Sequence, residues 1–234
     1  MAQEAAGGGM SRRTRVVRTL LYVLAFGLLG LSAALFYQTY APDLRFWLAQ
    51  QELSSQLPPL PAVESVSASS AATPTIDLTG WESQDAAFWK SLKMGDAFGR
   101  IVSKDAGVDA VVLKGATQAN LALGPAWIST TDLPGLTGNC AISGHRVTHG
   151  HPFRHLEKVK LGDTIYIYSP YRRYAYEVDR ILRVTPSHVE VIAHTEEPRL
   201  TLTTCDPPGR AIKRLVVQAH LIEVVLTKTD KSGS

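Results

Sequence analysis

The stretch RLTLTTCDPPG (residues 199–209) decides the fold and carries a candidate nucleophile. Its residues alternate between two sets, with Leu200, Leu202 and Thr204 in one and Thr201, Thr203 and Cys205 in the other. A period of two residues predicts a β-strand with two different faces. Cys205 comes at the end of this strand, directly before a turn sequence, so its thiol is expected at an exposed strand end.

Runs of the same kind recur on both sides of this stretch. They are short, rich in β-branched or aromatic residues, and bounded by glycine, proline or aspartate: residues 109–113, 140–143, 164–168, 174–184, 188–192 and 214–226. Residues 82–94 instead carry apolar side chains at helical spacing, which predicts one short helix. Seven or eight short strands with few helices favour an all-β antiparallel barrel or sandwich. Tyrosines on both sides of Ser169–Arg172 predict a hairpin there.

An apolar segment lies upstream of these strands. Residues 19–37 (TLLYVLAFGLLGLSAALFY) carry no charge, and a helix of this length reaches roughly 29 Å, close to the hydrocarbon thickness of a bilayer. Four arginines precede the segment and few charges follow it, which predicts a cytoplasmic N-terminus and an extracellular remainder. The alternative is a cleaved signal peptide with a small-residue site at Ser32–Ala34, but the apolar run exceeds the usual length for one.

Two further segments separate the apolar run from the strands. Residues 44–57 predict a short amphipathic extension of the helix, with Phe46 and Trp47 at the membrane interface. Residues 58–80 are rich in proline, serine, alanine and threonine and predict a spacer. The predicted organisation is a cytoplasmic basic tail (1–18), a transmembrane helix (19–37), a juxtamembrane segment and spacer (38–81), an extracellular domain (82–228) and a polar tail (229–234).

Composition excludes several classes of protein. Of 234 residues, 45% are hydrophobic and 19% are charged, which allows a buried core and excludes a wholly disordered chain. The net charge of +3 resides in the first 18 residues, where four arginines face one glutamate, so the rest of the chain is neutral. Neutrality argues against nucleic-acid binding by bulk electrostatics. The two cysteines are too few for a disulfide framework.

Three residues beyond the strand itself suggest chemistry for Cys205. Arg210 and Arg214 follow it closely, and a guanidinium beside a thiol favours the thiolate and can donate to a developing oxyanion. His145 ends the run GNCAISGHR (138–146), and an imidazole can exchange protons with the groups on which a thiolate acts. The plain alternatives are a buried free cysteine and a surface histidine.

These two motifs resemble those of the sortase family. GNCAISGHR is similar to the histidine region of sortases, and TLTTCDPPGRAIKR (201–214) is similar to their cysteine region, with a TLxTC signature and an arginine nine residues later. The likeness spans about residues 97–226, with histidine and cysteine 60 positions apart. It implies a closed barrel of about eight strands with short helices, behind an N-terminal transmembrane helix.

The resemblance also implies an activity. Cys205 would attack the Thr–Gly bond of an LPxTG-like sorting signal to give a thioacyl enzyme, with His145 as acid/base and Arg214 contacting substrate and oxyanion; Arg210 would be the less suitable arginine. An amine, such as a lipid-linked cell-wall precursor or a pilin lysine, would resolve the intermediate. The implied partners are surface proteins or pilins bearing sorting signals. No cofactor and no metal is implied.

The motifs resemble both class E and class C sortases. The polar C-terminus favours class E, whose family preference is for LAxTG-like signals, because class C chains commonly carry a second membrane segment. Cys140 departs from the family pattern, which has a plain apolar residue at that position. A bridge between Cys140 and Cys205 would abolish activity, but it requires a narrow range of Cα separations.

Other interpretations rest on weaker signals. His149, His151 and His155 crowd one loop, but they offer only three ligands where a structural zinc site takes four. The sequence LPGLTG (133–138) has one residue too many to be a sorting signal. An L,D-transpeptidase would carry Ser-His-Gly before its cysteine, whereas Thr203 and Thr204 stand here. The remaining alternative is a catalytically inactive, membrane-tethered binding module on a sortase scaffold.

Overall fold

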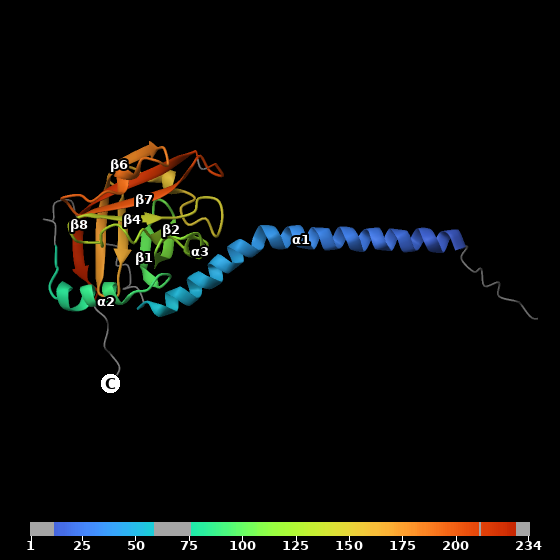
Figure 1. Cartoon of the computed structure of the whole chain (residues 1–234), viewed down its shortest axis with the longest axis horizontal. Helices are drawn as coiled ribbons and strands as arrows, with labels where there is room; N and C mark the ends of the chain where they lie inside the picture. Colours follow the sequence, from blue (N-terminus) through green and yellow to red (C-terminus); the bar gives the residue numbers. More distant parts are fainter. Residues whose placement is uncertain (1–11, 59–75, 211, 228–234) are drawn as a thin grey trace, which may run out of the picture. The chain divides into compact units, whose positions relative to one another are not determined.

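The structure is a computed structural model that describes residues 12–58, 76–210 and 212–227 (Figure 1). The helices and strands, in chain order, are α1 (Arg12–Gln56), η1 (Trp81–Asp85), α2 (Ala86–Ser91), β1 (Ala97–Ser103), β2 (Val108–Lys114), α3 (Gln118–Leu121), β3 (Ala126–Trp127), β4 (Asn139–Ser143), η2 (Leu156–Lys158), β5 (Thr164–Tyr168), β6 (Arg172–Val184), η3 (Val189–Ile192), β7 (Arg199–Asp206) and β8 (Lys213–Leu226). The chain divides into two compact units, with the boundary between Ala41 and Pro42.

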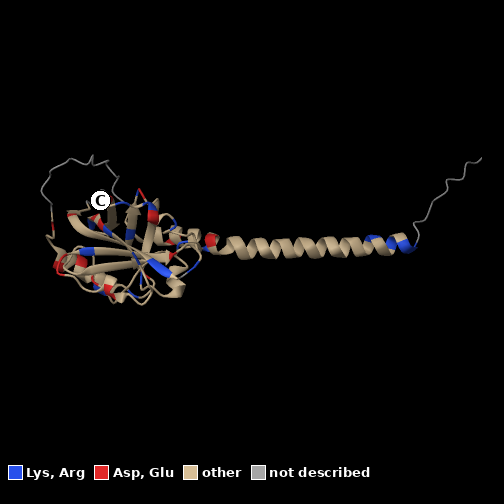
Figure 2. Cartoon of the chain, turned by 90° about the horizontal axis from the view of Figure 1, so that it is seen from above, with Lys and Arg blue, Asp and Glu red and all other residues tan. Residues whose placement is uncertain are grey.

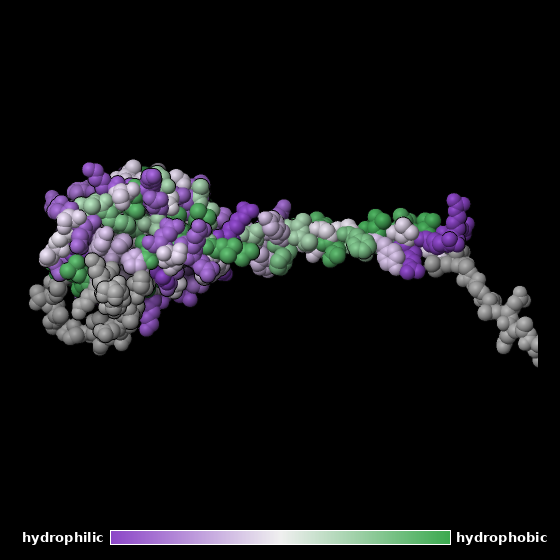
Figure 3. Space-filling view, turned by 90° about the horizontal axis from the view of Figure 1, so that it is seen from below, coloured by the Kyte–Doolittle hydropathy of each residue, from purple (hydrophilic) through white to green (hydrophobic). Residues whose placement is uncertain are grey.

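The first unit contains the greater part of α1. Its apolar side chains are exposed along the helix, as the green stretch in Figure 3 shows, and its basic residues gather at the N-terminal end in Figure 2. Among the described residues, α1 is the helix that is long and apolar enough to cross a membrane. Exposed apolar surface of this extent requires a lipid or protein environment, so α1 is consistent with the predicted membrane anchor.

The second unit is built on a closed barrel with the strand order β1-β2-β3-β4-β7-β8-β6-β5. The closed all-β barrel expected from the sequence is therefore confirmed. Neighbouring strands are antiparallel except at β2–β3 and β4–β7, which are parallel. The hairpin predicted around Ser169–Arg172 is the β5–β6 pair. Within the described residues every barrel strand has a neighbour on both sides, which protects the barrel against pairing with other chains.

One strand prediction is wrong, and two strands were not predicted. Residues 188–192 are not a strand, because η3 occupies Val189–Ile192 and its backbone instead accepts side-chain hydrogen bonds from the barrel. β1 and β3 are strands that the sequence pattern does not predict. Gly99 weakens the apolar pattern of β1, but a Cβ there would overlap the backbone of Tyr168, so the strand needs a glycine. β3 has two residues, too few for any pattern.

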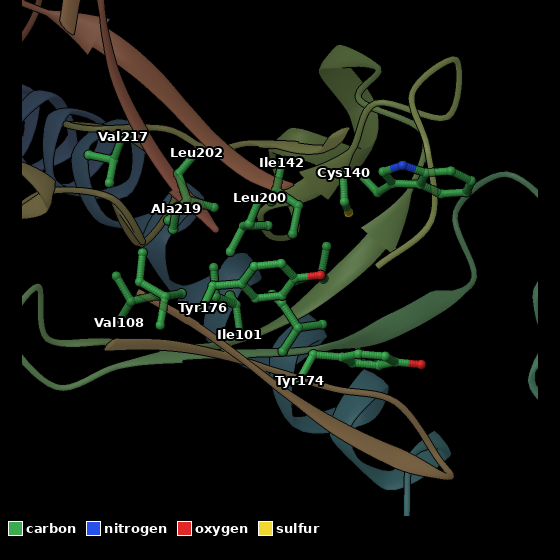
Figure 4. Close-up of a cluster of buried hydrophobic side chains, with 14 of the residues drawn as sticks. Ile101, Val108, Cys140, Ile142, Tyr174, Tyr176, Leu200, Leu202, Val217 and Ala219 are labelled. Carbon is green, nitrogen blue, oxygen red and sulfur yellow. The ribbon is translucent and has the colours of Figure 1, made fainter. Parts of the chain in front are cut away.

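Apolar side chains from every long strand fill the barrel. Figure 4 shows Cys140, Ile142 and Leu200 among this group, and all three are fully buried. Tyr176 is also fully buried, and its hydroxyl accepts a hydrogen bond from the Gly135 amide at 2.8 Å. The alternation read from residues 199–209 is thus correct, with Leu200 and Leu202 on the inner face of β7.

Residues that precede the barrel pack against it through a buried ion pair. Arg172, at the start of β6, is bound by Asp85 at 3.0 Å, and neither side chain is exposed. The same guanidinium donates to the carbonyls of Asp77 and Thr79, each at 2.5 Å. These contacts extend the packed region upstream to Asp77. The predicted spacer, residues 58–80, falls largely on residues 59–75, outside the described residues.

The end of α1 also packs on the barrel. Phe46 is 3% exposed, so the expectation that it lies at the membrane interface is wrong, whereas Trp47 is 62% exposed. The amphipathic pattern of residues 44–57 was read correctly as helical, but a sequence pattern does not tell whether protein or lipid covers the apolar face.

Candidate active site

Cys205 lies near the end of β7 on the outer face of the barrel. The inner face of the strand is filled by Leu200 and Leu202, which are fully buried, and Cys205 alternates with them. Its side chain is half-buried, and its sulfur forms no disulfide. A partly exposed thiol at a strand end is accessible to a substrate, as a nucleophile must be.

Arg214 is the cross-strand partner of Cys205. The β7–β8 register pairs the two residues, and Arg214 Nη1 lies 3.5 Å from Cys205 Sγ. A guanidinium at this distance can donate to an oxyanion that forms on the attacked carbonyl. Arg210 instead lies in the exposed turn, where its backbone amide bonds the Pro207 carbonyl at 3.0 Å. The geometry therefore favours Arg214 over Arg210.

His145 follows β4, at the same barrel edge as Cys205. Because β4 and β7 pair in parallel, their C-terminal ends meet at one edge. The Gly144 amide donates to the Thr203 carbonyl at 3.2 Å, and Thr204 Oγ1 donates to the Gly144 carbonyl at 2.8 Å. The residue before His145 is thus bonded to the residues just before Cys205.

The environment of the His145 ring favours the neutral imidazole. Its pKa is lowered from the ordinary value, first by burial and second by the neighbouring His149. The two rings are stacked, with centroids 5.0 Å apart and planes at 25°. At neutral pH the ring is therefore ready to accept a proton, and the imidazolium form that a proton donor needs is a minority species.

A third residue at this edge, Arg146, carried no role in the sequence analysis. It is 5% exposed, and its Nη1 donates to the Cys205 carbonyl at 3.2 Å and to Asp206 Oδ1 at 2.6 Å. Its Nη2 donates to Glu157 at 2.9 Å, and Arg183 binds the other oxygen of Asp206 at 3.1 Å. The residues after His145 and after Cys205 are thereby ion-paired. The sequence offered one signal for this ion pair: Arg146 and Asp206 each stand directly after a candidate catalytic residue.

Arg146 also affects the charge around Cys205. The Asp206 carboxylate is adjacent to the thiol in sequence and brings a negative charge to this edge of the barrel. Two guanidinium groups, from Arg146 and Arg183, neutralise it. The arrangement leaves Arg214 as the cation that contacts the sulfur itself.

The connection between β6 and β7 covers part of the same outer face. Asn139 donates to the carbonyls of Val191 and Ala193, both at 3.1 Å, and Gln218 donates to Val191 at 2.9 Å. Thr201, which shares the outer face with Cys205, bonds Asn139 at 2.7 Å. Four residues separate Thr201 from Cys205, about 13 Å of strand. The β6–β7 connection therefore covers the outer face of β7 upstream of Cys205.

The remaining candidate residues do not form a metal site in the described part of the chain, where no group of three or more histidine, cysteine, aspartate or glutamate side chains is arranged to hold an ion. In the histidine-rich loop, His149 stacks on His145, and His155 Nδ1 lies 3.9 Å from Glu157. These histidines therefore contact other protein side chains and do not converge on a shared ion site.

The fold and this edge define a closed β-barrel with a thiol and an imidazole at the C-terminal ends of two parallel strands and an arginine near the start of the antiparallel strand β8. A model of the Sortase domain family matches residues 102–222. The chain belongs to the sortase family, as its two motifs predicted.

Individual relatives agree with this assignment. Sortase A of Bacillus anthracis is 33% identical over 133 residues, covering 56% of this chain and 63% of that protein. Sortase E from Streptomyces avermitilis superposes with a TM-score of 0.54 at 29% identity, over 60% of this chain and 97% of that chain. A Clostridium perfringens Sortase D5 transpeptidase gives a TM-score of 0.55 at 29% identity, over 60% and 88%. The chain spans less than two thirds of the length of the first curated relatives it matches.

Proposed function

We propose that this chain is a membrane-anchored cysteine transpeptidase that joins proteins bearing a sorting signal to an amine. The observation that carries the proposal is the cross-strand pair of Cys205 and Arg214, 3.5 Å apart at the edge that also carries His145. A thiol, a cation and a proton carrier are the three groups that acyl transfer through a thioester requires. Relatives described as sortases and as a transpeptidase support the same activity.

The reaction begins with the Cys205 thiolate. It attacks the carbonyl carbon of the Thr–Gly bond in an LPxTG-like or LAxTG-like signal, and Arg214 donates to the oxyanion. The C–N bond then breaks, and the departing amine takes a proton from the His145 imidazolium. In the second half, an acceptor amine gives up a proton to His145 and attacks the thioester, which releases the Cys205 thiolate beside the His145 imidazolium and forms a new amide.

The lowered pKa of His145 has a consequence for this cycle. The departing amine needs a proton from the imidazolium, and burial of the ring, with His149 beside it, disfavours that form. A two-ionisation pH profile of kcat/KM is the expected result.

The substrate, subclass and cellular setting belong to the same proposal. A class E-like enzyme would prefer LAxTG over LPxTG, and the neighbours include sortase E, sortase C and sortase D5 structures. The basic N-terminal end and the exposed apolar surface of α1 support a single-pass anchor, with the N-terminus in the cytoplasm and the barrel outside the cell. The acceptor would be a cell-wall precursor amine or a pilin lysine.

A transpeptidation assay tests the proposal. The full chain in detergent micelles is incubated with LAxTG and LPxTG peptides, with triglycine as the amine, and the products are separated by mass. The expected product is the peptide cut after threonine and joined to triglycine, with a matched peptide of scrambled order left intact. Uncut peptides beside a freely alkylated Cys205 would contradict the proposal and favour the inactive binding module.

A further inference from the structure

The Gln50 side chain attaches the juxtamembrane end of α1, Pro42–Gln56, to β2. It forms hydrogen bonds with backbone groups, as a neighbouring strand would. Gln50 Oε1 accepts from the Val111 amide at 2.7 Å, and Gln50 Nε2 donates to the carbonyls of Val111 and Leu123 at 3.1 and 2.9 Å. Val111 is beyond the short β2–β3 pairing, so these backbone groups need another partner. Leu53, 8% exposed, packs beside them.

The preceding turn of the same helix contacts the histidine loop, residues 147–152. Asp43 Oδ1 accepts a hydrogen bond from the Gly150 amide at 2.8 Å. Phe46 is 3% exposed, and a Cβ on Gly150 would overlap its ring, so the ring rests directly on the loop backbone. A cavity of about 210 Å³ lies between these two residues and the turn that joins β1 to β2. The loop is therefore held from the helix side by one hydrogen bond and one aromatic ring.

The backbone of the loop adopts an unusual conformation at this contact. His149, Gly150 and His151 have φ angles of 53°, 66° and 41°, so three successive residues are left-handed. Residues other than glycine adopt this conformation uncommonly and keep it where their surroundings fix them. The contact with Asp43 and Phe46 falls on the middle residue of the three.

The histidine loop also supplies the ring that stacks on His145, the candidate acid/base. The His149 ring stacks on His145, with centroids 5.0 Å apart. His149 Nδ1 is buried and has no hydrogen-bond partner among the described residues, so packing and the loop backbone determine where this ring lies.

We propose that the juxtamembrane end of α1 is a positioning element of the active site: Asp43 and Phe46 hold the histidine loop so that His149 stacks on His145 and fixes its ring. Asp43, Phe46 and His149 are then positioning residues, and none of them contacts the reacting atoms. The inference rests on the proposed role of His145 as acid/base.

The pKa of His145 distinguishes release of the histidine loop from loss of the Asp43 charge. Burial and His149 both lower the pKa of His145, so freeing the loop raises it toward the ordinary value. The shift of His145 comes from burial and from His149, so loss of the Asp43 charge alone does not raise its pKa. Other charged or titratable groups around the loop are unchanged in the variants below: Arg146, His151, Arg154, His155, Glu157 and Asp109.

Histidine titration by NMR separates these effects. The full chain, labelled at its seven histidines, is held in detergent micelles, and His145→Gln assigns the resonance. Phe46→Ala and Asp43→Ala are expected to raise the His145 midpoint toward about 6.5, whereas Asp43→Asn, which keeps an acceptor oxygen for Gly150, leaves the loop in place and shifts it little or downward. Leu48→Ala, an exposed position on the same helix, is the matched control and leaves the midpoint unchanged.

A double variant tests whether the helix acts through His149. His149→Ala alone should raise the His145 midpoint, and adding Phe46→Ala should produce no further rise, because both changes remove the same stack. An unmoved midpoint in Phe46→Ala and Asp43→Ala, with the proteins folded by thermal melting, would overturn the proposal. Equal downward shifts in Asp43→Ala and Asp43→Asn would also overturn it, because charge alone would then explain them.

Kinetics supply a second readout. In Phe46→Ala, kcat is expected to fall by about three- to tenfold with little change in KM. The reason is that the His145 ring is misplaced, whereas the strand β7 that carries Cys205 is unchanged. If the unaltered chain shows no transpeptidation, the proposed function fails, and the histidine titration still decides whether the helix positions His145.

Discussion

The two cysteines occupy opposite environments in neighbouring strands. Cys140 in β4 pairs with Leu200 of β7 and is fully buried inside the barrel, where burial raises the pKa of its thiol far above the ordinary value. Cys205 is five residues further along β7, about 16 Å away along the strand, on the outer face and 3.5 Å from a guanidinium nitrogen. The same side chain is buried and inert in one place and accessible beside a cation in the other.

The separation of Cys140 and Cys205 also excludes redox control by a disulfide between them. A disulfide requires Cα atoms within about 7 Å, and side chains on opposite faces of the barrel wall at this separation do not meet that requirement. Cys140 therefore acts as a small apolar residue of the core.

Replacing each cysteine in turn should give the largest difference in transpeptidation rate. Cys205→Ala is expected to lower transpeptidation by about a thousandfold or more, because the covalent route is lost. Cys140→Val should retain activity within about threefold, since a volume-similar apolar residue suits the core. Both rates are measured with one peptide and one amine, and comparable losses in two folded variants would contradict the assignment of separate roles.

The arginine beside Cys205 should have the next largest effect. Arg214→Ala is expected to reduce kcat by about 100- to 1,000-fold, the typical loss of one oxyanion donor, with Arg214→Lys intermediate. Arg210→Ala is the control, because Arg210 is exposed in the turn. A larger loss in Arg210→Ala than in Arg214→Ala would reverse the choice between the two arginines.

The ion pair that joins the two catalytic segments should appear as a stability effect. Arg146→Met leaves the Asp206 carboxylate with one cation, and loss of one partner of a buried pair costs about 3 kcal/mol. Thermal melting should show a fall in Tm of about 5–10 °C. Asp206→Asn in the same chain should recover part of the loss, because no buried charge then lacks its partner. A double variant no more stable than Arg146→Met alone would count against charge pairing as the cause.

The smallest effect concerns pH and the His145 ring. The pKa of His145 is lower in the folded chain than its ordinary value of 6.5, so the unfolded chain binds more protons between these two values. The free energy of unfolding therefore rises as pH increases through that window and falls on acidification.

His145→Gln removes this dependence. Relative to the unaltered chain, the variant should gain stability toward acid by less than about 1 kcal/mol, since solvent screens a half-exposed ring. His188→Gln, at an exposed histidine in the β6–β7 connection, is the control. A difference between variant and parent that does not change with pH would exclude His145 as the titrating group.

The sequence predicted the parts of this site that depend on one strand and one motif. Alternation in residues 199–209 put Cys205 and Leu200 on opposite faces, and the resemblance to the sortase cysteine region pointed to Arg214. These predictions worked because a strand has a fixed period and a hairpin fixes its register.

The rest depends on contacts between distant segments. Nothing local indicates that Arg146 reaches Asp206, 60 residues away, or that Asp43 accepts from Gly150, 107 residues away. The segment at 188–192 resembled a strand because its Val and Ile residues fit one, but the tertiary structure uses its carbonyls to cap the outer face instead.

The most direct test of the central claim is to locate the acyl group. The full chain is quenched in acid during incubation with an LAxTG or LPxTG peptide, and intact mass and peptide mapping follow. The account predicts a thioester adduct equal to the peptide cut after threonine, carried by the fragment that contains Cys205 and absent in Cys205→Ala. An adduct on Cys140, or one that persists in Cys205→Ala, would contradict it.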